Sequence, residues 1–243
     1  MTLLLFIEQV LNGLQLGTML FLMAAGLTLV FGIMHLINLA HGSLYMIGAY
    51  VAATVQQATG SFTLGLLAAL PAAALTGMAM EAIALRRLYD RDHLDQVLAT
   101  FGLILFFNEL VKIVWGPQAY FMAVPAALSG SVEILPGAPY PAYRLAIVAT
   151  GIAAALFLYL LITRTRIGML IRAGATNREM VNALGVNVDR LYMLVFGLGA
   201  ALAGLADTFG RVLLPGALSE MTIYILMAAI LVWRPQGLFP AHA

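Results

Sequence analysis

The chain has 243 residues, of which 63% are hydrophobic and 9% are charged. A soluble domain is about 45–50% apolar and about 25% charged, so these values exclude an ordinary soluble domain as well as a disordered chain. The net charge of +1 excludes a basic surface for nucleic acid, and the absence of cysteine excludes disulfides, iron–sulfur clusters and thiol nucleophiles. The first ten residues, MTLLLFIEQV, lack Lys and Arg, so we expect no cleaved signal peptide there. From this composition we expect the chain to be embedded in a lipid bilayer.

Several stretches approach the length of about 20 apolar residues that a membrane-spanning helix needs. Runs such as LLAALPAAAL are apolar on every side, which favours helices over the alternating strands of a transmembrane barrel. No internal repeat or linker divides the chain, so we expect one domain, residues 1–243, that is an all-α bundle of about seven spans. The expected spans are Gly13–Met34, Leu39–Val55, Phe62–Leu85, Val97–Trp115, Leu145–Ile162, Leu191–Ala206 and a short one at Met221–Trp233.

The distribution of cations predicts the orientation of these spans. Nine of the twelve lie in connections on one side of the predicted bundle, which should therefore be cytoplasmic. The N-terminus and the stretch Gly116–Pro141 then lie outside, and the C-terminus lies inside. The nine are Arg86, Arg87 and Arg91 after the third span, Arg164, Arg166, Arg172, Arg178 and Arg190 after the fifth, and Arg234 after the last.

A few polar or charged side chains fall within or next to the predicted spans, where they are costly unless they face protein or a water-filled cavity. Glu109 and Lys112 are three residues apart and share a helical face. We interpret them as an ion pair near the outer interface, with a place in a solute path or proton relay as the alternative. Glu81 is close to Arg86 at the cytoplasmic boundary, which favours a structural role there.

Small residues predict where helices approach each other closely. Gly13 and Gly17 form a GxxxG pattern in the first span, and the stretch from Gly197 to Gly204 provides a dense small face in the sixth. Both patterns indicate helix packing and say little about a substrate.

The stretch between the first two spans, MHLINLAHGS at Met34–Ser43, places two imidazoles and an amide between apolar runs. No HExxH motif, acidic residue or cysteine completes a metal site, and no GxSxG motif supports a hydrolase. A hydrogen-bonded turn that re-enters the membrane or lines a pore is the better interpretation. The alternative is that these residues only tie the two spans together. The candidate path residues are Asn38, His41, Gly42 and Ser43.

The long connection after the fifth span contains a predicted short helix, Asn177–Leu184. Thr176 and Glu179 fit the S/T-x-x-E capping box, and Gly185 stands where a helix-ending glycine belongs. Asn187 is expected to cap the next span. About eight residues are too few for a stable isolated helix, so it must dock on a lipid surface or in a protein groove. Its small apolar face, which lacks Trp and Phe, favours a groove. The expected docking residues are Thr176, Glu179, Met180, Ala183, Leu184 and Gly185.

Four stretches together resemble the LivH-type permeases, which are membrane subunits of ABC importers for branched-chain amino acids and related amides. The resemblance runs from about residue 5 to about residue 240 and is specific only in combination. The stretches are His35–Tyr50, LDQVLATFGL at Leu94–Leu103, ATNREMVNALGVNVDRLYMLVFGLGAALAGLA at Ala175–Ala206 and RPQGLF at Arg234–Phe239.

The resemblance implies a non-catalytic transport subunit of the bacterial inner membrane that needs no cofactor. It implies four partners of the complex: a second, homologous permease, two cytoplasmic ATPases and an extracytoplasmic substrate-binding protein. The short helix before Gly185 would be the coupling helix that fits a groove of the ATPase. Branched-chain amino acids are the expected cargo, with urea or short amides, or a stand-alone secondary transporter, as alternatives. The sequence shows no nucleophile or metal-ligand constellation of the kind that an intramembrane enzyme would need.

The chain departs from the family pattern in two places. Ser43 stands where the family commonly has an acidic residue, and about two helices of sequence are missing between Ala206 and Asp207. The sixth span then has only 16 residues before Asp207, and we expect the small face from Gly197 to Gly204 to meet lipid instead of neighbouring helices. From these two features the sequence predicts correct insertion but little or no transport.

Overall fold

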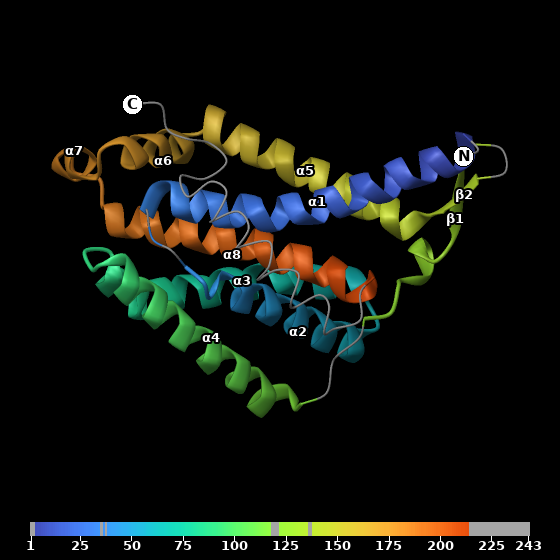
Figure 1. The fold of residues 1–243 in the computed structure, drawn as a ribbon, viewed down its shortest axis with the longest axis horizontal. Helices are drawn as coiled ribbons and strands as arrows, with labels where there is room; N and C mark the ends of the chain where they lie inside the picture. The colour runs from blue at the N-terminus through green and yellow to red at the C-terminus, as the bar shows by residue number, and fades with distance from the viewer. Residues whose placement is uncertain (1–2, 35, 37, 118–121, 136–137, 214–243) are drawn as a thin grey trace.

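The computed structural model describes residues 3–34, 36, 38–117, 122–135 and 138–213, and these form a helical bundle with one small hairpin (Figure 1). The predicted all-α class is confirmed, while the seventh expected span, Met221–Trp233, lies outside the described residues. The elements in chain order are α1 (Leu3–Met34), α2 (His41–Thr59), α3 (Phe62–Ile83), η1 (Leu85–Leu88), α4 (His93–Trp115), η2 (Ala126–Leu128), β1 (Ser131–Leu135), β2 (Ala138–Pro141), α5 (Ala142–Arg164), α6 (Arg166–Thr176), α7 (Arg178–Ala183) and α8 (Val188–Leu213).

Five of these helices, α1, α3, α4, α5 and α8, are long and apolar enough to cross a membrane. The second expected span is present as α2, but α2 is not among the five. Residues 41–50 of α2 are all buried, because α2 packs against both α3 and α8. Protein rather than lipid therefore surrounds the first half of α2, which explains how it carries polar side chains.

Helix α1 is longer than the expected span, which began at Gly13. Its 32 residues extend about 48 Å, more than the roughly 30 Å of a hydrocarbon core. The outer turns contact the hairpin: Asn12 Oδ1 accepts hydrogen bonds from Arg144 Nη1 (2.6 Å) and from the Tyr140 hydroxyl (3.2 Å). Strands β1 and β2 pair antiparallel within the stretch that the sequence places outside. The hairpin thus joins α1 to α5 at this end of the bundle.

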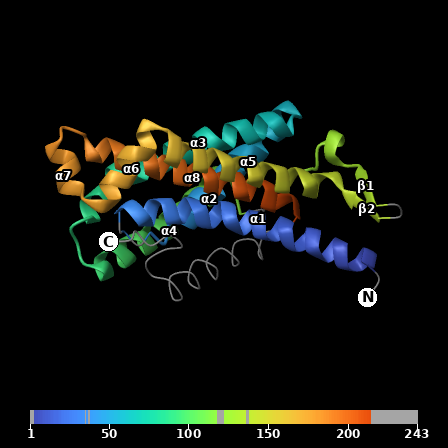
Figure 2. The same cartoon turned by 90° about the horizontal axis from the view of Figure 1, so that it is seen from above.

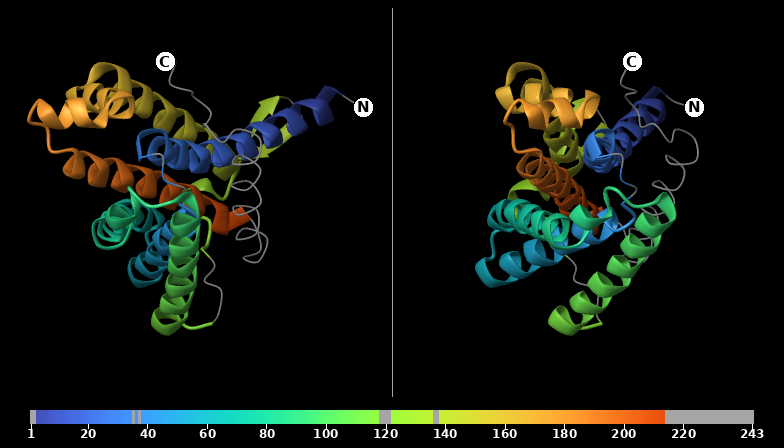
Figure 3. Two further views of the ribbon diagram at one scale, coloured as in Figure 1. Left: turned by 60° about the vertical axis from the view of Figure 1, so that its left-hand side comes forward. Right: turned by 90° about the vertical axis from the view of Figure 1, so that its left-hand side faces the viewer.

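Helix α8 runs through the middle of the bundle and packs against α1, α2 and α3 (Figures 2 and 3). A Cβ atom built on Gly26 would lie 2.5 Å from the Gly199 carbonyl oxygen, and one built on Gly48 would lie 2.7 Å from Gly204 Cα. The expectation that this small face of α8 meets lipid is therefore wrong, because α1, α2 and α3 supply the close partners within the same chain. By contrast, Gly17 of the GxxxG pattern has no such neighbour within 4 Å among the described residues.

The position where the family resemblance predicts a missing segment, Ala206–Asp207, lies inside α8. The helix continues past Ala206 to Leu213, and Ala206, Thr208 and Phe209 are buried. The expected 16-residue limit of the sixth span is therefore wrong, because Asp207 does not end the helix. Both structural reasons for expecting poor transport are thereby removed.

The Arg-rich connections gather at one end of the bundle. Helices α6 and α7, the α3–α4 connection and the start of α8 lie at this end, and the first turns of α1 and the hairpin lie at the other (Figures 1 and 2). This arrangement fits the predicted grouping of the cationic loops on a single side.

Candidate translocation and coupling sites

The polar turn connects the end of α1 at Met34 to the start of α2 at His41. Asn38 Oδ1 accepts a hydrogen bond from the Ala40 N–H at 3.0 Å, and the Ser43 N–H donates to the Ala40 carbonyl at 3.0 Å. An Asn side chain that bonds two residues ahead in this way stabilises a tight turn. Asn38, His41, Gly42 and Ser43, the candidate path residues, are all buried.

Four polar atoms of this turn are buried without a hydrogen-bond partner among the described residues: Asn38 Nδ2, both ring nitrogens of His41, and Ser43 Oγ. An unsatisfied buried donor or acceptor costs about 1–3 kcal/mol, so several in one place require an explanation. His41 Nε2 faces α1, since a Cβ on Gly26 would lie 3.1 Å from it. The unused hydrogen-bonding capacity is thus concentrated where α1, α2 and α8 meet.

Helix α6 precedes the short helix that the sequence predicted, and sequence reasoning missed it. Thr165 caps it by accepting a hydrogen bond from the Gly168 N–H at 3.1 Å. Gly168, Ile171 and Gly174 are its buried residues, spaced three apart on the face that meets the bundle. This three-residue spacing is visible in the sequence, but three positions are too few to predict a packed helix from the sequence.

The short helix α7 begins at Arg178, one residue later than predicted. Asn177 Oδ1 accepts a hydrogen bond from the Met180 N–H at 2.9 Å, so Asn177 is the N-cap. The predicted capping box of Thr176 and Glu179 is therefore wrong. Thr176 belongs to the last turn of α6, where its hydroxyl donates to the Arg172 carbonyl at 3.0 Å, and it is not free to cap α7.

The end of α7 follows the sequence prediction. Gly185 has φ +83°, its N–H donates to the Asn182 carbonyl (3.0 Å), and the Val186 N–H donates to the Val181 carbonyl (3.3 Å). These two bonds form a Schellman motif, which needs a residue with positive φ. Asn187 caps α8 as predicted, since its Oδ1 accepts from the Arg190 N–H at 2.9 Å.

Two apolar side chains of this segment point away from the bundle. Met180 and Leu184 are 65% and 78% exposed, whereas Val181 is buried in the core. Val181 therefore does not contribute to the outward face of α7. All the expected docking residues, Thr176, Glu179, Met180, Ala183, Leu184 and Gly185, are exposed.

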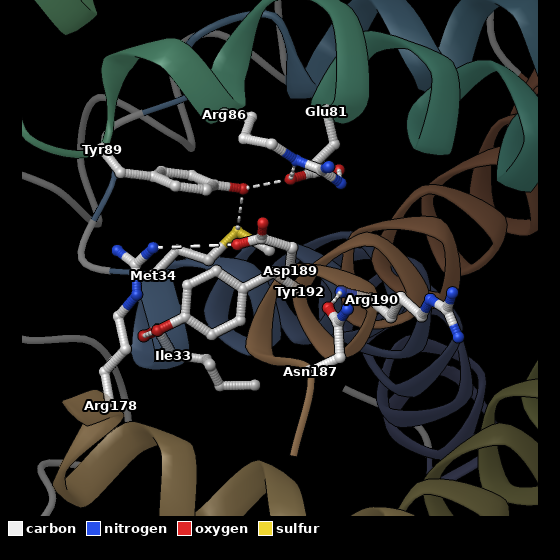
Figure 4. Close-up of polar contacts among 10 residues, drawn as sticks. All are labelled: Ile33, Met34, Glu81, Arg86, Tyr89, Arg178, Asn187, Asp189, Arg190 and Tyr192. Carbon is white, nitrogen blue, oxygen red and sulfur yellow. Dashed lines mark hydrogen bonds and ion pairs between the residues drawn. The ribbon is translucent and has the colours of Figure 1, made fainter. Parts of the chain in front are cut away.

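A buried carboxylate lies at the same end of the bundle (Figure 4). Glu81 is fully buried and accepts hydrogen bonds from Arg86 Nη2 (3.0 Å), Arg86 Nε (3.3 Å) and the Tyr89 hydroxyl (2.7 Å). The hydrogen bond to Glu81 raises the pKa of the Arg86 guanidinium, and burial raises the pKa of the Tyr89 hydroxyl. Arg86 therefore stays charged and Tyr89 stays protonated, which fits the structural role expected for Glu81.

The second expected ion pair is also present. Lys112 Nζ lies 2.7 Å from Glu109 Oε1, and both side chains are more than half exposed. Their position on the outward surface of α4 agrees with an interfacial ion pair.

Sequence reasoning missed the residues around Arg178. Its guanidinium carbon lies 5.5 Å from the centre of the Tyr89 ring and 5.3 Å from that of the Tyr192 ring. These residues come from α7, the α3–α4 connection and α8, and no periodic or local pattern relates them. Only the packing of the three segments brings them together.

The long apolar helices and the enclosed polar turn define a polytopic helical membrane protein. The chain belongs to the family of permease components of branched-chain amino acid transport systems, because the model of that family matches residues 9–233. This match runs across the Ala206–Asp207 position. No solved structure matches the chain.

Proteins similar to this chain are also described as branched-chain amino acid transport permeases. The chain is 31% identical over 214 residues to the high-affinity branched-chain amino acid transport system permease protein BraD of Pseudomonas aeruginosa and to LivH of Escherichia coli, an alignment that covers 83% of this chain and 69% of each relative. It is 30% identical over 230 residues to a probable LivH of Methanocaldococcus jannaschii, covering 88% of this chain and 70% of the relative. These relatives support a transport subunit rather than an enzyme, and they do not favour the urea, short-amide or stand-alone transporter alternatives.

Proposed function

We propose that this chain is the permease subunit of an ATP-driven importer that moves leucine, isoleucine and valine across a bacterial inner membrane. The family match over residues 9–233 carries this proposal. We further propose that residues 1–243 form one permease domain, with the N-terminus outside and the C-terminus in the cytoplasm. Its partners would be a second, homologous permease, two cytoplasmic ATPases and an extracytoplasmic substrate-binding protein.

The proposed contact with the ATPase is the outward face of α7. Met180 and Leu184 are large apolar side chains on a protein surface without a partner among the described residues. A helix of six residues does not hold its shape in water by itself, so its two hydrogen-bonded caps and a docking partner must support it. This arrangement supports a coupling role for Thr176, Glu179, Met180, Ala183, Leu184 and Gly185.

The proposed solute path passes the polar turn. The unpaired atoms of Asn38, His41 and Ser43 supply donors and acceptors that a water molecule or a polar solute can use. Gly42, the second residue of α2, is buried beside these atoms. In a membrane protein, polar groups enclosed at helix ends commonly mark a transport route.

The proposed function is tested by transport. The chain is reconstituted in proteoliposomes with its partner subunits and the binding protein, and uptake of labelled leucine is measured with and without ATP. We expect uptake that needs ATP, the binding protein and this chain, because the small-residue face of α8 packs closely against α1 and α2 within this chain. A correctly assembled complex that takes up no branched-chain amino acid would contradict the proposal.

Breaking the end of α7 should uncouple the complex. Gly185→Val places a β-branched residue at φ +83°, which such side chains rarely adopt, although no neighbouring atom lies within 4 Å. We expect the strain, about 1–2 kcal/mol, to melt the last turn and to lower ATP-driven uptake at least tenfold, while membrane insertion is unchanged. Uptake and ATP hydrolysis are measured on the same proteoliposomes.

The matched control is Gly130→Val, a substitution in the outer connection at a glycine that also has no neighbour within 4 Å and has no positive φ. Ala183→Asp, which puts a charge on the exposed face, should give the same loss as Gly185→Val. Normal uptake by both α7 variants would remove this helix from the coupling mechanism.

A cysteine at position 41 tests the path. The chain has no native cysteine, so His41→Cys provides a single reporter thiol. We expect a water-soluble maleimide to label it in at least one nucleotide state of the complex, because the path must open to water during transport. The buried Ala203→Cys, on α8, serves as the unlabelled control. Protection of position 41 in every nucleotide state would instead favour a purely structural turn.

A further inference from the structure

Arg178, the first residue of α7, lies beside two aromatic rings from distant parts of the chain (Figure 4). Its guanidinium carbon lies 5.5 Å from the Tyr89 ring centre and 5.3 Å from the Tyr192 ring centre, within cation–π range of both. The two rings contact each other edge to face, with 5.5 Å between their centres. Asp189 Oδ1 adds an ion contact at 3.9 Å from Arg178 Nη2. We call Arg178, Tyr89 and Tyr192 the Arg178 clamp.

The hydroxyl groups of both tyrosines in the clamp contact the last turn of α1. The Tyr192 hydroxyl donates to the Ile33 carbonyl at 3.3 Å, and the Tyr89 hydroxyl lies 3.7 Å from Met34 Sδ. The Tyr89 hydroxyl also donates to the buried carboxylate of Glu81 at 2.7 Å. The clamp therefore touches the end of α1 directly and the end of α3 through Glu81.

The last turn of α1 leads into the polar turn that carries the unpaired atoms of Asn38, His41 and Ser43. The short α7 has one buried side chain, Val181, so the clamp adds to the contacts with α6 and α8 that position this helix. A displacement of α7 must pull Arg178 off the two rings or carry the rings with it. In the second case the end of α1 moves as well.

We propose that the Arg178 clamp transmits movements of α7 to the polar turn, and that Arg178 is a positioning residue for transport. The proposal rests on the proposed contact between α7 and the ATPase. An arginine suits this role, because its delocalised guanidinium can lie within cation–π range of two rings while it keeps an ion contact, and the compact, strongly hydrated ammonium of lysine is less suited to this. Arg178→Lys keeps the positive charge but replaces the planar guanidinium, so it is the most specific variant.

A distance measurement on the purified chain tests the clamp without transport. Spin labels are attached to Met180→Cys on α7 and Asp90→Cys in the α3–α4 connection, two exposed positions in a chain without native cysteine. We expect a narrow distance distribution that broadens when Arg178→Ala is added. Arg190→Ala is the matched control, since Arg190 is a nearby exposed cation that points away from the rings (Figure 4). An unchanged distribution in the Arg178→Ala chain would overturn the clamp.

Transport by the assembled complex tests the transmission. We expect Arg178→Lys to lower leucine uptake per ATP hydrolysed about tenfold, the size of a typical coupling between two sites, while basal ATP hydrolysis is retained. Arg190→Ala should leave this ratio unchanged. A ratio that is unchanged in both Arg178→Lys and Arg178→Ala would overturn the proposal. Absence of uptake by the unmodified complex would instead contradict the proposed function, so the two failures are distinguishable.

Discussion

Replacing Arg86 by Met should destabilise the chain strongly, by about 3–5 kcal/mol of unfolding free energy. The substitution leaves the carboxylate of Glu81 fully buried, with the Tyr89 hydroxyl as its one hydrogen-bond partner among the described residues. Desolvating a carboxylate without a cation is costly, and methionine supplies similar volume without charge. The unfolding free energy is measured by SDS titration of the purified chain in micelles.

The double variant Glu81→Met with Arg86→Met is the matched control. Because it removes both charges, it should recover most of the lost unfolding free energy, as replacing a complete buried ion pair commonly does. Glu81→Gln with Arg86 intact should cost less than Arg86→Met, because the Arg86 side chain is 35% exposed and can reach water. A stable Arg86→Met chain would show that burial of Glu81 does not depend on its ion pair with Arg86.

Replacing Gly26 by Ala should disrupt the crossing of α1 and α8. The added Cβ would lie 2.5 Å from the Gly199 carbonyl oxygen, which is backbone and can move only with its helix. Overpacking of this kind costs about 1–3 kcal/mol of unfolding free energy. The same Cβ would lie 3.1 Å from His41 Nε2, so we also expect leucine uptake to fall. Both quantities are measured on the same purified variant.

Gly17→Ala is the matched control, on the same helix and with the same added atom. No atom lies within 4 Å of its built Cβ, so we expect wild-type stability and uptake. Equal behaviour of the two variants would mean that α1 and α8 do not approach as closely as the structure places them.

Sequence reasoning predicted the features that depend on the bilayer or on near neighbours in the chain. The apolar runs behind α3, α4 and α5 are recognisable because a spanning helix must satisfy its backbone internally and present apolar side chains to lipid. Gly185 and Asn187 were predicted correctly because a helix cap involves only residues within a few positions. The resemblance that pointed to the family likewise depends on local motifs.

The capping of α7 shows where local reasoning ends. Thr176 and Asn177 are both good N-cap residues, and the sequence pattern favoured Thr176 because of Glu179. The structure selects Asn177, since α6 extends through Thr176 and uses its hydroxyl. Whether α6 forms depends on its packing against α1, α5 and α8, which no short window of sequence contains.

The sequence by itself determined that this chain is a helical membrane permease, that its described cationic connections share one end of the bundle, and that Gly185 and Asn187 cap their helices. Only the tertiary structure decided that α8 is central and that its small-residue face packs against α1 at Gly26 and against α2 at Gly48. It also decided that Arg178 lies beside the rings of Tyr89 and Tyr192. The physical reason is the range of the interactions. Lipid solvation and capping act on each segment separately, whereas close helix packing and side-chain clusters exist only after distant segments have been brought together.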